Sequence, residues 1–587
     1  MLIDVAVPEM SLNSLTYESS INLQEGSRVI VEVVGSLHTG FVIGRSEKKL
    51  SSDIIIKPVE GIIDNECLID PDIWNMSLWA AKVCMCGTAE ALKAFIPRPF
   101  YMGKIINSPE ISVSVNGKFN EKNFFHPLDS ERVKFFISEL EKPGRTLILF
   151  PQKETAKSFF KNLPDKLKSE ALLWPSDNSK KLWQSWKLIH EKKFRIVIAP
   201  PGGISAPLMP EKIIVDDEAN PAYILPYNLN LSARSLAGHR ASFINAEFIT
   251  AGRMPSLKTY MRKNPKEIII PERKYIILSD IYHSRTKKEE INGVKGNIPL
   301  TYSLIKNTYR ELSKGHNVIW ILNRKGEASE IFCEKCGNII TCQKCGGIMQ
   351  ARNDGNILRC RKCGFICRLP EKCSKCGCDF LTGRRPGLDA LAKITGKYYN
   401  DVHIYSEGVK SSSVHGLILS TQRGLELCGK IDVNLISWLD LDAELWSQDY
   451  GTRFNVFNML MESYWRGREN NPERKVLIQS RKTGMKIAEF LSQGWSRFIP
   501  DELKNRYEFM LPPYGYIIEI LFSSKKTREN MLDTFMNAGI FVMDPGDDKL
   551  PIYVNTDSIE TVRKLIEPEM LIRNTKNKYI KITVRNE

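Results

Sequence analysis

Short apolar runs alternate with amphipathic stretches through the first half of this 587-residue chain. The apolar runs have the length of single buried strands, and the amphipathic stretches place apolar residues at helical spacing. The runs span residues 146–150, 195–199 and 212–216, and the helical stretches beside them include 130–140 and 155–163. Strands that alternate with helices are typical of a parallel sheet. The pattern therefore predicts an α/β lobe over residues 121–282.

The same alternation returns further along the chain. A helical stretch at 304–312 precedes strand-like runs at 317–322, 416–420, 433–438 and 475–479. A cysteine-rich segment, residues 333–378, interrupts this series. We therefore expect a second α/β lobe built from residues 298–332 and 379–490, with a separate module inserted into it.

The two ends of the chain differ from the lobes. Residues 1–100 begin with β-rich segments at 28–34 and 39–44, joined by a turn near Gly35, and continue into a predicted helix over 71–92. Residues 491–587 predict a small α+β domain with strands at 516–522 and 579–584. Residues 101–120 are predicted to be a linker. The expected fold class is α/β, with two lobes, an inserted cysteine module and smaller domains at the ends.

The charge balance narrows the choice of partners. The chain has 83 Lys and Arg against 68 Asp and Glu, a formal net charge of +15. A strongly basic chain suggests phosphate-rich partners, although charge alone does not separate DNA from RNA or membrane lipid. The first residues lack the pattern of a signal peptide, and no apolar run reaches membrane-spanning length. We expect a soluble, cytoplasmic protein with no membrane partner.

Eight of the 14 cysteines form four Cys-x-x-Cys pairs. Each pair puts two sulfurs on one side of a tight turn, and two pairs make the tetrahedral thiolate cage that zinc prefers. Five residues separate the first two pairs and 14 separate the second from the third, which favours a nested arrangement of two structural zinc sites. The outer site would use Cys333, Cys336, Cys373 and Cys376, and the inner site Cys342, Cys345, Cys360 and Cys363. Disulfides are the alternative, and Cys367 and Cys378 remain as spare thiols or extra ligands.

Two α/β lobes on a basic chain suggest a nucleic-acid motor, which needs a phosphate-binding loop. Such a loop has the sequence Gly-x-x-x-x-Gly-Lys followed by Ser or Thr. Neither Ser nor Thr follows any Gly-Lys pair here, and the first helix of the first lobe is predicted to begin at Asp129 or Ser130 without a preceding glycine. Asp216-Asp-Glu-Ala does follow a predicted strand, where motors hold magnesium, but an ordinary acidic turn is the alternative.

The two lobes and the four cysteine pairs resemble the family of the bacterial primosomal replication-restart protein PriA (primosomal protein N′), and the resemblance extends nearly end to end. It implies RecA-like helicase lobes, two zinc ions in the second lobe and an N-terminal domain that binds the 3′ end of DNA. Tyr17, Gly35 and Lys57 fall where that domain contacts the terminal nucleotide. Leu15 and Thr16 depart from the family's Phe-Asp at neighbouring positions.

The helicase motifs also depart from the family. Asp216 keeps the metal-binding position, Asp217 is a shortened substitute for the catalytic Glu, and Ala219 replaces a His. Arg468 aligns with one arginine of the finger motif, while Trp465 takes the place of the other. These residues are expected to be remnants without catalytic function, because phosphoryl transfer depends on positioning and charge stabilisation together. Binding of ATP with Mg²⁺ is therefore doubtful.

The resemblance and its departures together predict a DNA-binding replication-restart protein that has lost its motor. It would recognise stalled or branched forks and help to load the replicative helicase, with forked or single-stranded DNA, primosome and helicase-loading proteins and single-strand-binding protein as partners, near the nucleoid. One alternative is an active ATP-dependent 3′→5′ helicase with a divergent nucleotide site. Another is a zinc-dependent adaptor that docks proteins and has no role on DNA.

Overall fold

The computed structural model describes most of the chain. The described residues are 1–8, 14–47, 55–104, 118–175, 179–191, 193–225, 229–281, 286–287, 300–323, 328–333, 335–344, 346–352, 357–360, 364–379, 381–445, 449–480, 482–546, 551–571 and 580–586. They form two compact units, one of residues 1–125, 131–265 and 501–587 and one of residues 126–130 and 266–500. Most of the predicted linker at 101–120 lies outside the described residues. Every helix in the described part is too short or too polar to cross a bilayer.

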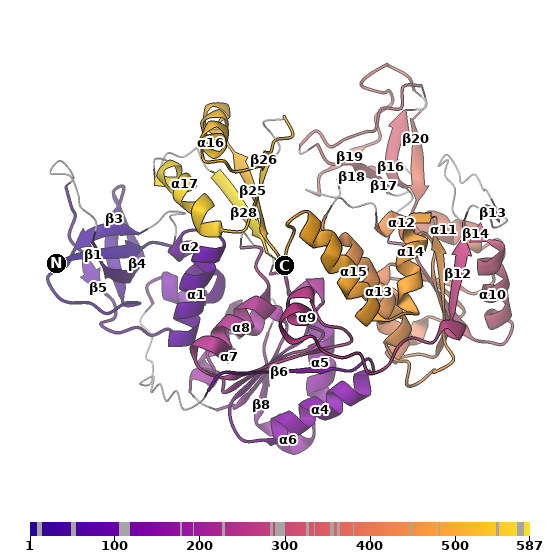
Figure 1. Ribbon diagram of the computed structural model, residues 1–587, viewed down its shortest axis with the longest axis horizontal. Helices are drawn as coiled ribbons and strands as arrows, with labels where there is room; N and C mark the ends of the chain where they lie inside the picture. Colours follow the sequence, from indigo (N-terminus) through magenta and orange to yellow (C-terminus); the bar gives the residue numbers. More distant parts are fainter. Residues whose placement is uncertain are drawn as a thin grey trace. The chain divides into compact units, whose positions relative to one another are not determined.

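A six-stranded, fully parallel sheet forms the centre of the first unit (Figure 1). Its strand order is β6-β11-β10-β7-β9-β8. The strands are β6 (Asn120–Phe125), β7 (Thr146–Leu149), β8 (Ala171–Leu173), β9 (Ile196–Ala199), β10 (Lys212–Val215) and β11 (Glu247–Gly252). Strands β7, β9 and β10 are buried along their whole length, as expected for a sheet covered on both faces. The α/β prediction for this lobe is confirmed.

Helices cover both faces of this sheet (Figure 1). One face packs against α4 (Asp129–Glu141) and α5 (Lys153–Lys161), with Phe136 and Phe159 at the centre of that core. The other face packs against α1 (Pro71–Val83), α2 (Thr88–Phe95), α7 (Ser179–His190) and α8 (Ala233–Phe243). Shorter helices are α3 (Arg98–Tyr101), α6 (Asp165–Ser169) and α9 (Leu257–Lys263).

Helices α1 and α2 come from the region predicted as the end-binding domain, yet they pack on the first lobe. Asp72 on α1 and Arg240 on α8 form a fully buried ion pair, and Arg240 also donates to the carbonyl oxygens of Ile204 and Ala206 over 2.6 and 2.8 Å. The predicted single helix over 71–92 is two helices, because the chain turns between them at Met85 with a φ of 54°. Breaking the buried pair would leave an uncompensated charge in the core of the lobe.

The N-terminal residues form a five-stranded sheet of order β2-β1-β4-β3-β5, with all pairings antiparallel. Its strands are β1 (Leu2–Ala6), β2 (Leu15–Glu18), β3 (Arg28–Val33), β4 (Ser36–Arg45) and β5 (Gly61–Ile62). Strands β3 and β4 form the predicted hairpin, turning through Val34 and Gly35. The β-rich prediction for this region is confirmed.

A four-stranded antiparallel sheet and two helices form the C-terminal part of the first unit. The elements are β25 (Tyr516–Phe522), α16 (Lys525–Asn537), β26 (Val542–Met543), β27 (Ile552–Thr556), α17 (Ile559–Leu571) and β28 (Ile580–Arg585). The side chain of Met85 lies in the hydrophobic core of this sheet. The loop between α1 and α2 is thereby joined to the C-terminal domain.

The second unit has its own six-stranded parallel sheet, of order β12-β24-β23-β15-β22-β21. The strands are β12 (Ile276–Asp280), β15 (Asn317–Ile321), β21 (Val402–Tyr405), β22 (Leu417–Ser420), β23 (Val433–Trp438) and β24 (Lys475–Ser480). The first lobe was predicted to end at residue 282. Strand β12 falls inside that boundary but pairs with β24 in the second sheet, so the boundary was set too late in the chain. A short apolar run does not specify which of two similar sheets it joins.

Helices pack around this second sheet, and a smaller sheet extends from it. The helices are α10 (Tyr302–Leu312), α11 (Leu388–Thr395), α12 (Leu441–Glu444), α13 (Thr452–Trp465) and α14 (Lys482–Leu491), and the division between the units falls within α15 (Trp495–Glu508). The smaller sheet has the order β19-β18-β17-β16-β20 and is antiparallel. It comprises β16 (Ala328–Cys333), β17 (Met349–Arg352), β18 (Ile357–Cys360), β19 (Ile366–Arg368) and β20 (Leu381–Pro386), so the chain leaves the lobe on β16 and returns on β20.

Candidate functional site

The three residues predicted to contact a DNA end all bond to one residue, Glu32 on β3. Tyr17 donates its hydroxyl to the Glu32 carbonyl oxygen over 3.0 Å, and Lys57 Nζ lies 2.7 Å from Glu32 Oε1. Lys57 holds the pKa of Glu32 below its usual range, helped by the backbone N–H of Gly35. Tyr17 is buried, and burial raises the pKa of its phenol, while the Lys57–Glu32 pair is open to solvent. The fold thus brings the predicted residues together around Glu32, whose backbone carbonyl accepts from Tyr17 and whose carboxylate pairs with Lys57, and which sequence reasoning missed.

The turn beside this cluster explains why glycine is needed there. Val34 and Gly35 have φ values of 48° and 78°, the two left-handed residues of a tight hairpin turn. Gly35 adopts this conformation at no steric cost, whereas a β-branched residue such as Val34 is strained by it. Val34 is also 93% exposed, so the tip of the hairpin projects into solvent. Thr16, on the same strand as Tyr17, donates to Asp4 Oδ1 over 2.7 Å instead.

The acidic residues after β10 are each paired with an arginine. Arg132 Nε lies 2.9 Å from Asp216 Oδ1, and Arg234 Nη1 lies 2.9 Å from Glu218 Oε2. The intervening carboxylate pairs with an arginine from the segment after β11, since Arg253 Nη1 lies 3.2 Å from Asp217 Oδ2. All three carboxylates are buried. Arginines of the same lobe therefore neutralise all three carboxylates.

The residue that pairs with Asp216 comes from the first turn of α4. This helix begins at Asp129 as predicted, and Arg132 reaches from it to the end of β10. In a phosphate-binding lobe the first helix presents backbone amides and a lysine to the phosphates. Here it presents a guanidinium to a carboxylate of its own lobe.

The finger remnant Arg468 is also enclosed by its own lobe. Its guanidinium lies 3.8 Å from the ring centre of Tyr464 and 4.7 Å from that of Tyr275. It donates to the carbonyl oxygen of Arg474 over 3.0 Å, and burial lowers its pKa. The neighbouring Arg466 pairs with Glu462 one turn back on α13. The geometry gives Arg468 a structural role within the second unit.

The cysteines of the predicted outer zinc site lie together. The sulfurs of Cys333, Cys336, Cys373 and Cys376 all lie within 4.8 Å of one another. Cys333 Sγ is 3.5 Å from Cys376 Sγ, and Cys336 Sγ is 3.7 Å from Cys373 Sγ. A tetrahedral zinc with Zn–S bonds of about 2.3 Å needs sulfurs about 3.8 Å apart, so the donor set fits zinc. Among the described residues this is the group suited to hold a metal ion.

The turns that begin at Cys333, Cys342, Cys360 and Cys373 share the same two backbone hydrogen bonds. The N–H of the first cysteine donates to the carbonyl of the fifth residue after it, over 2.7–2.9 Å. A glycine follows each second cysteine and donates its N–H to the carbonyl of the first, over 2.8–3.1 Å. These glycines, with φ from 69° to 74°, are Gly337, Gly346, Gly364 and Gly377. The repeated Cys-x-x-Cys-Gly pattern is visible in the sequence and could have been used to predict these turns.

The predicted inner site is described in part. Cys342 and Cys360 are buried in one core cluster and start two of the four turns, whereas Cys345 and Cys363 lie outside the described residues. The backbone N–H of Lys344 lies 3.4 Å from Cys342 Sγ, as the N–H of Lys375 does from Cys373 Sγ in the outer site. A second zinc ion therefore stays a prediction.

Comparison with known proteins finds matches to PriA. Residues 4–97 match the model of the PriA 3′ DNA-binding domain (3′BD). The replication restart protein PriA of Borreliella burgdorferi is 20% identical over 545 residues, covering 84% of this chain and 81% of that protein. PriA of Bacillus subtilis is 21% identical over 368 residues, covering 59% of this chain and 45% of that protein. Our chain is a relative of PriA.

Similarity to solved structures is more distant. A structure of RecG bound to a three-way DNA junction has a TM-score of 0.34 and 8% identity, covering 66% of this chain and 44% of that one. The resemblance to PriA expected from the sequence is confirmed by the PriA matches. Within the matched PriA domain lie Tyr17, Gly35, Lys57 and the unpredicted Glu32.

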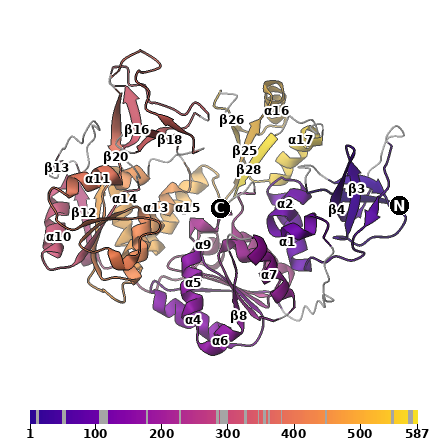
Figure 2. The same cartoon turned by 180° about the vertical axis from the view of Figure 1, so that it is seen from behind.

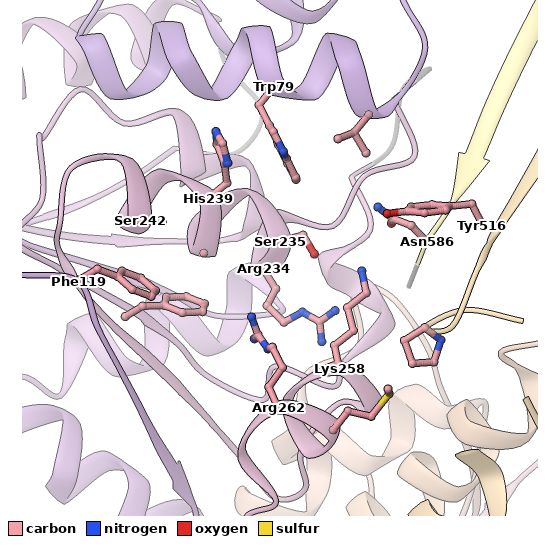
Figure 3. Close-up of a pocket in the computed structure, with 15 residues that line it drawn as sticks. Trp79, Phe119, Arg234, Ser235, His239, Ser242, Lys258, Arg262, Tyr516 and Asn586 are labelled. Atoms are coloured by element: carbon pink, nitrogen blue, oxygen red, sulfur yellow. The ribbon is translucent and has the colours of Figure 1, made fainter. Parts of the chain in front are cut away.

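This PriA relative also has a cationic pocket that the sequence did not reveal. It lies in the first unit, has a volume of about 620 Å³, and is lined by residues of α1, α8, α9 and the C-terminal domain (Figure 3). Arg234, Lys258 and Arg262 line it, where Arg234 also pairs with Glu218 and Arg262 with Glu121. The stacked rings of Trp79 and His239, 4.4 Å apart, line one wall. Burial, followed by the two nearby arginines, lowers the pKa of Lys258 to about 7. The pocket suits an anionic ligand with an apolar part.

The two spare cysteines have different surroundings. Cys378 contributes its carbonyl oxygen, which accepts the N–H of Cys373 in the outer site. Cys367 is half-buried on β19, and burial raises the pKa of its thiol, with a further contribution from Cys342. Neither belongs to the group of four that could hold a metal ion in the described part of the chain.

Proposed function

We propose that this chain is a replication-restart protein that binds stalled or branched DNA forks through a free 3′ end and helps to load the replicative helicase, without unwinding DNA itself. The observation that carries the proposal is the convergence of Tyr17, Gly35 and Lys57 on Glu32 inside the region that matches the PriA 3′ DNA-binding domain. The PriA relatives are named as replication restart proteins.

The end-binding cluster suggests a division of roles. Lys57 is exposed and can leave Glu32 to contact a backbone phosphate, which makes binding sensitive to salt. Buried Tyr17 fixes the backbone of β3 through its hydroxyl, and Gly35 lets the DNA end approach the turn closely. These contacts recognise the end of a strand and not its sequence.

Loss of the motor follows from the charge pairing in the two lobes, which we propose are RecA-like. Asp216, Asp217 and Glu218 are neutralised by arginines of their own lobe, and Arg468 is held between two tyrosines. Phosphoryl transfer needs a metal-binding carboxylate, a base and a mobile cation placed together on the nucleotide. The residues present do not fit ATP with Mg²⁺, so strand separation would fall to other proteins.

A comparison of linear with circular single-stranded DNA tests end binding. The protein should bind a linear oligonucleotide with a free 3′ end more tightly than a circular one of equal length. Lys57→Gln should weaken the linear complex and leave the circular one unchanged. Lys118→Gln, at another exposed lysine of the same unit, is the matched control. Equal affinity of the wild-type protein for both DNAs would refute the proposal.

An assay of DNA-stimulated ATP hydrolysis tests the loss of the motor. We expect no turnover above background, with or without forked DNA, and no effect of Asp216→Asn on that background. Turnover that Asp216→Asn abolishes would instead support the active helicase with a divergent nucleotide site.

Primosome proteins, helicase-loading proteins and single-strand-binding protein remain proposed partners. The pocket supports docking of an acidic protein segment, because Lys258 and two arginines that also pair with carboxylates line a cavity with an aromatic wall. Lys258→Gln combined with Arg262→Gln should abolish binding of purified single-strand-binding protein if that protein uses the pocket. Unchanged binding of this protein would assign the pocket to another ligand.

A further inference from the structure

The exposed aromatic side chains of the second unit lie on and beside two of its helices, α10 and α11. Among the described residues of this unit, the exposed aromatics are Tyr302, Tyr309 and Tyr398, at 62%, 70% and 53% exposure. Tyr302 and Tyr309 lie on α10, and Tyr398 follows the C-terminal end of α11. Large aromatic rings kept in water on one face, and nowhere else on the described unit, suggest a binding function.

Both helices belong to the second unit (Figures 1 and 2), and both pack into one core cluster on the same face of its sheet. The buried ring of Trp320 contacts α10 and the segment after α11, because its Nε1 donates to Thr308 over 2.9 Å and its ring lies 6.1 Å from that of Tyr399. Thr308 precedes the exposed Tyr309 and Tyr399 follows the exposed Tyr398, so both segments that carry exposed tyrosines pack on this one indole.

This surface is basic. Lys306, Arg310 and Lys314 are exposed on and just after α10, and Lys393 and Lys397 are exposed on and just after α11. Lys306 Nζ lies 5.9 Å from the ring centre of Tyr302, so a cation sits over an exposed aromatic face. Of the carboxylates on the two helices, Glu311 is buried against His316 and Lys475, and Asp389 is half-buried.

We propose that the α10–α11 face binds single-stranded DNA, with bases stacked on the tyrosines and phosphates on the surrounding lysines and arginines. Aromatic rings set among cations match the alternating bases and phosphates of a single strand, and stacking tolerates any base. On α10, Tyr302 and Tyr309 are seven residues apart, which is about 10.5 Å along a helix and close to three stacked bases of about 3.4 Å each. This surface needs no strand end and is separate from the 3′-end cluster.

Circular single-stranded DNA tests this surface without involving the 3′-end cluster. The double variant Tyr302→Ala/Tyr309→Ala should bind circular DNA at least about fivefold more weakly than the wild type, because stacking on two rings is lost. The matched variant Tyr302→Phe/Tyr309→Phe keeps the rings and should bind within about twofold of the wild type. Lys306→Gln should reduce the slope of log affinity against log salt by about 0.7. Thermal unfolding should be unchanged, since both tyrosines are exposed.

Three results would overturn the proposal. The alanine variant could bind circular DNA as tightly as the wild type, which would leave this face to a protein partner. The phenylalanine variant could lose as much affinity as the alanine variant, which would exclude stacking. The wild-type protein could fail to bind circular DNA at all. The preference for linear over circular DNA measures binding at the 3′-end cluster. A failure of 3′-end binding is therefore detected separately from a failure of the α10–α11 face to bind single-stranded DNA.

Discussion

Arg132 on α4 donates a hydrogen bond from Nε to Oδ1 of Asp216 at the end of β10, over 2.9 Å, and both side chains are buried. This pair ties the first helix of the lobe to the strand end where a nucleotide-binding lobe would hold a metal. An internal cation thus neutralises the carboxylate that the sequence resemblance assigns to magnesium.

Removal of Arg132 should destabilise the first unit. Arg132→Met leaves the Asp216 carboxylate buried without its partner, which typically costs about 3–5 kcal/mol. The double variant Arg132→Met/Asp216→Leu should recover most of that loss, because two buried charges are replaced by apolar groups. Urea unfolding of the single and double variants gives these free energies. Lys134→Met, on the exposed face of the same helix, is the control and should cost less than about 1 kcal/mol. A single variant no less stable than this control would show that the pair is dispensable.

Metal analysis should return two zinc ions per chain. Cys333→Ser combined with Cys373→Ser should reduce this to one, because these residues supply half of the outer site's sulfurs. Cys342→Ser combined with Cys360→Ser should remove the other ion and leave the outer one bound. A wild-type content of one zinc, or full metal retention in the first variant, would contradict the nested pairing. Mass spectrometry under native conditions measures each content directly.

The glycines after the cysteine pairs should be needed for metal retention. Gly364→Ala places a Cβ in a left-handed conformation with no neighbouring atom within 4 Å, so the cost is purely conformational, roughly 1–2 kcal/mol. We expect faster zinc release to a chelator from this variant and a smaller effect from Gly364→Asn. Gly429→Ala, also in open space but without a left-handed backbone, should release zinc at the wild-type rate. Identical rates for Gly364→Ala and Gly429→Ala would argue against a role for the turn.

Lys258 should make stability depend on pH above neutrality. Burial lowers its folded-state pKa to about 7, while an unfolded lysine has a pKa of about 10.4. Between these values the unfolded chain binds a proton that the folded chain does not, so this residue makes stability rise with pH from about 7 to about 10.4. This gain in stability declines as the pH falls from about 10.4 and is lost at about pH 7, where the folded chain also binds the proton. Lys258→Met should flatten the profile in that window, and Lys118→Met should not. Urea unfolding at several pH values provides the comparison, and parallel profiles for both variants would disprove the assignment.

Local pattern was enough to predict most elements. The hairpin of β3 and β4, strands β7, β9 and β10 of the first parallel sheet, strands β15, β22, β23 and β24 of the second and the four cysteine turns depend on residues close together in sequence. The outer zinc ligands, Cys333 to Cys376, could be paired because chain length limits which turns can meet. The PriA relationship was also visible from motif spacing alone.

Partners far apart in sequence were decided only by the tertiary structure. No pattern indicates that Asp216 pairs with Arg132, 84 residues away, or that Glu32 joins Tyr17 to Lys57. Pairing between distant segments also explains why the first lobe was predicted to extend to residue 282, past strand β12, which pairs with β24.

The sequence by itself determined the resemblance to PriA, the order of the elements and the residue types available for zinc and DNA. The tertiary structure decided that the acidic remnants are neutralised by arginines, that α1 and α2 cover the first lobe, and that Tyr302, Tyr309 and Tyr398 are exposed. Secondary structure follows from side-chain periodicity within a few residues, whereas these contacts depend on how whole layers pack.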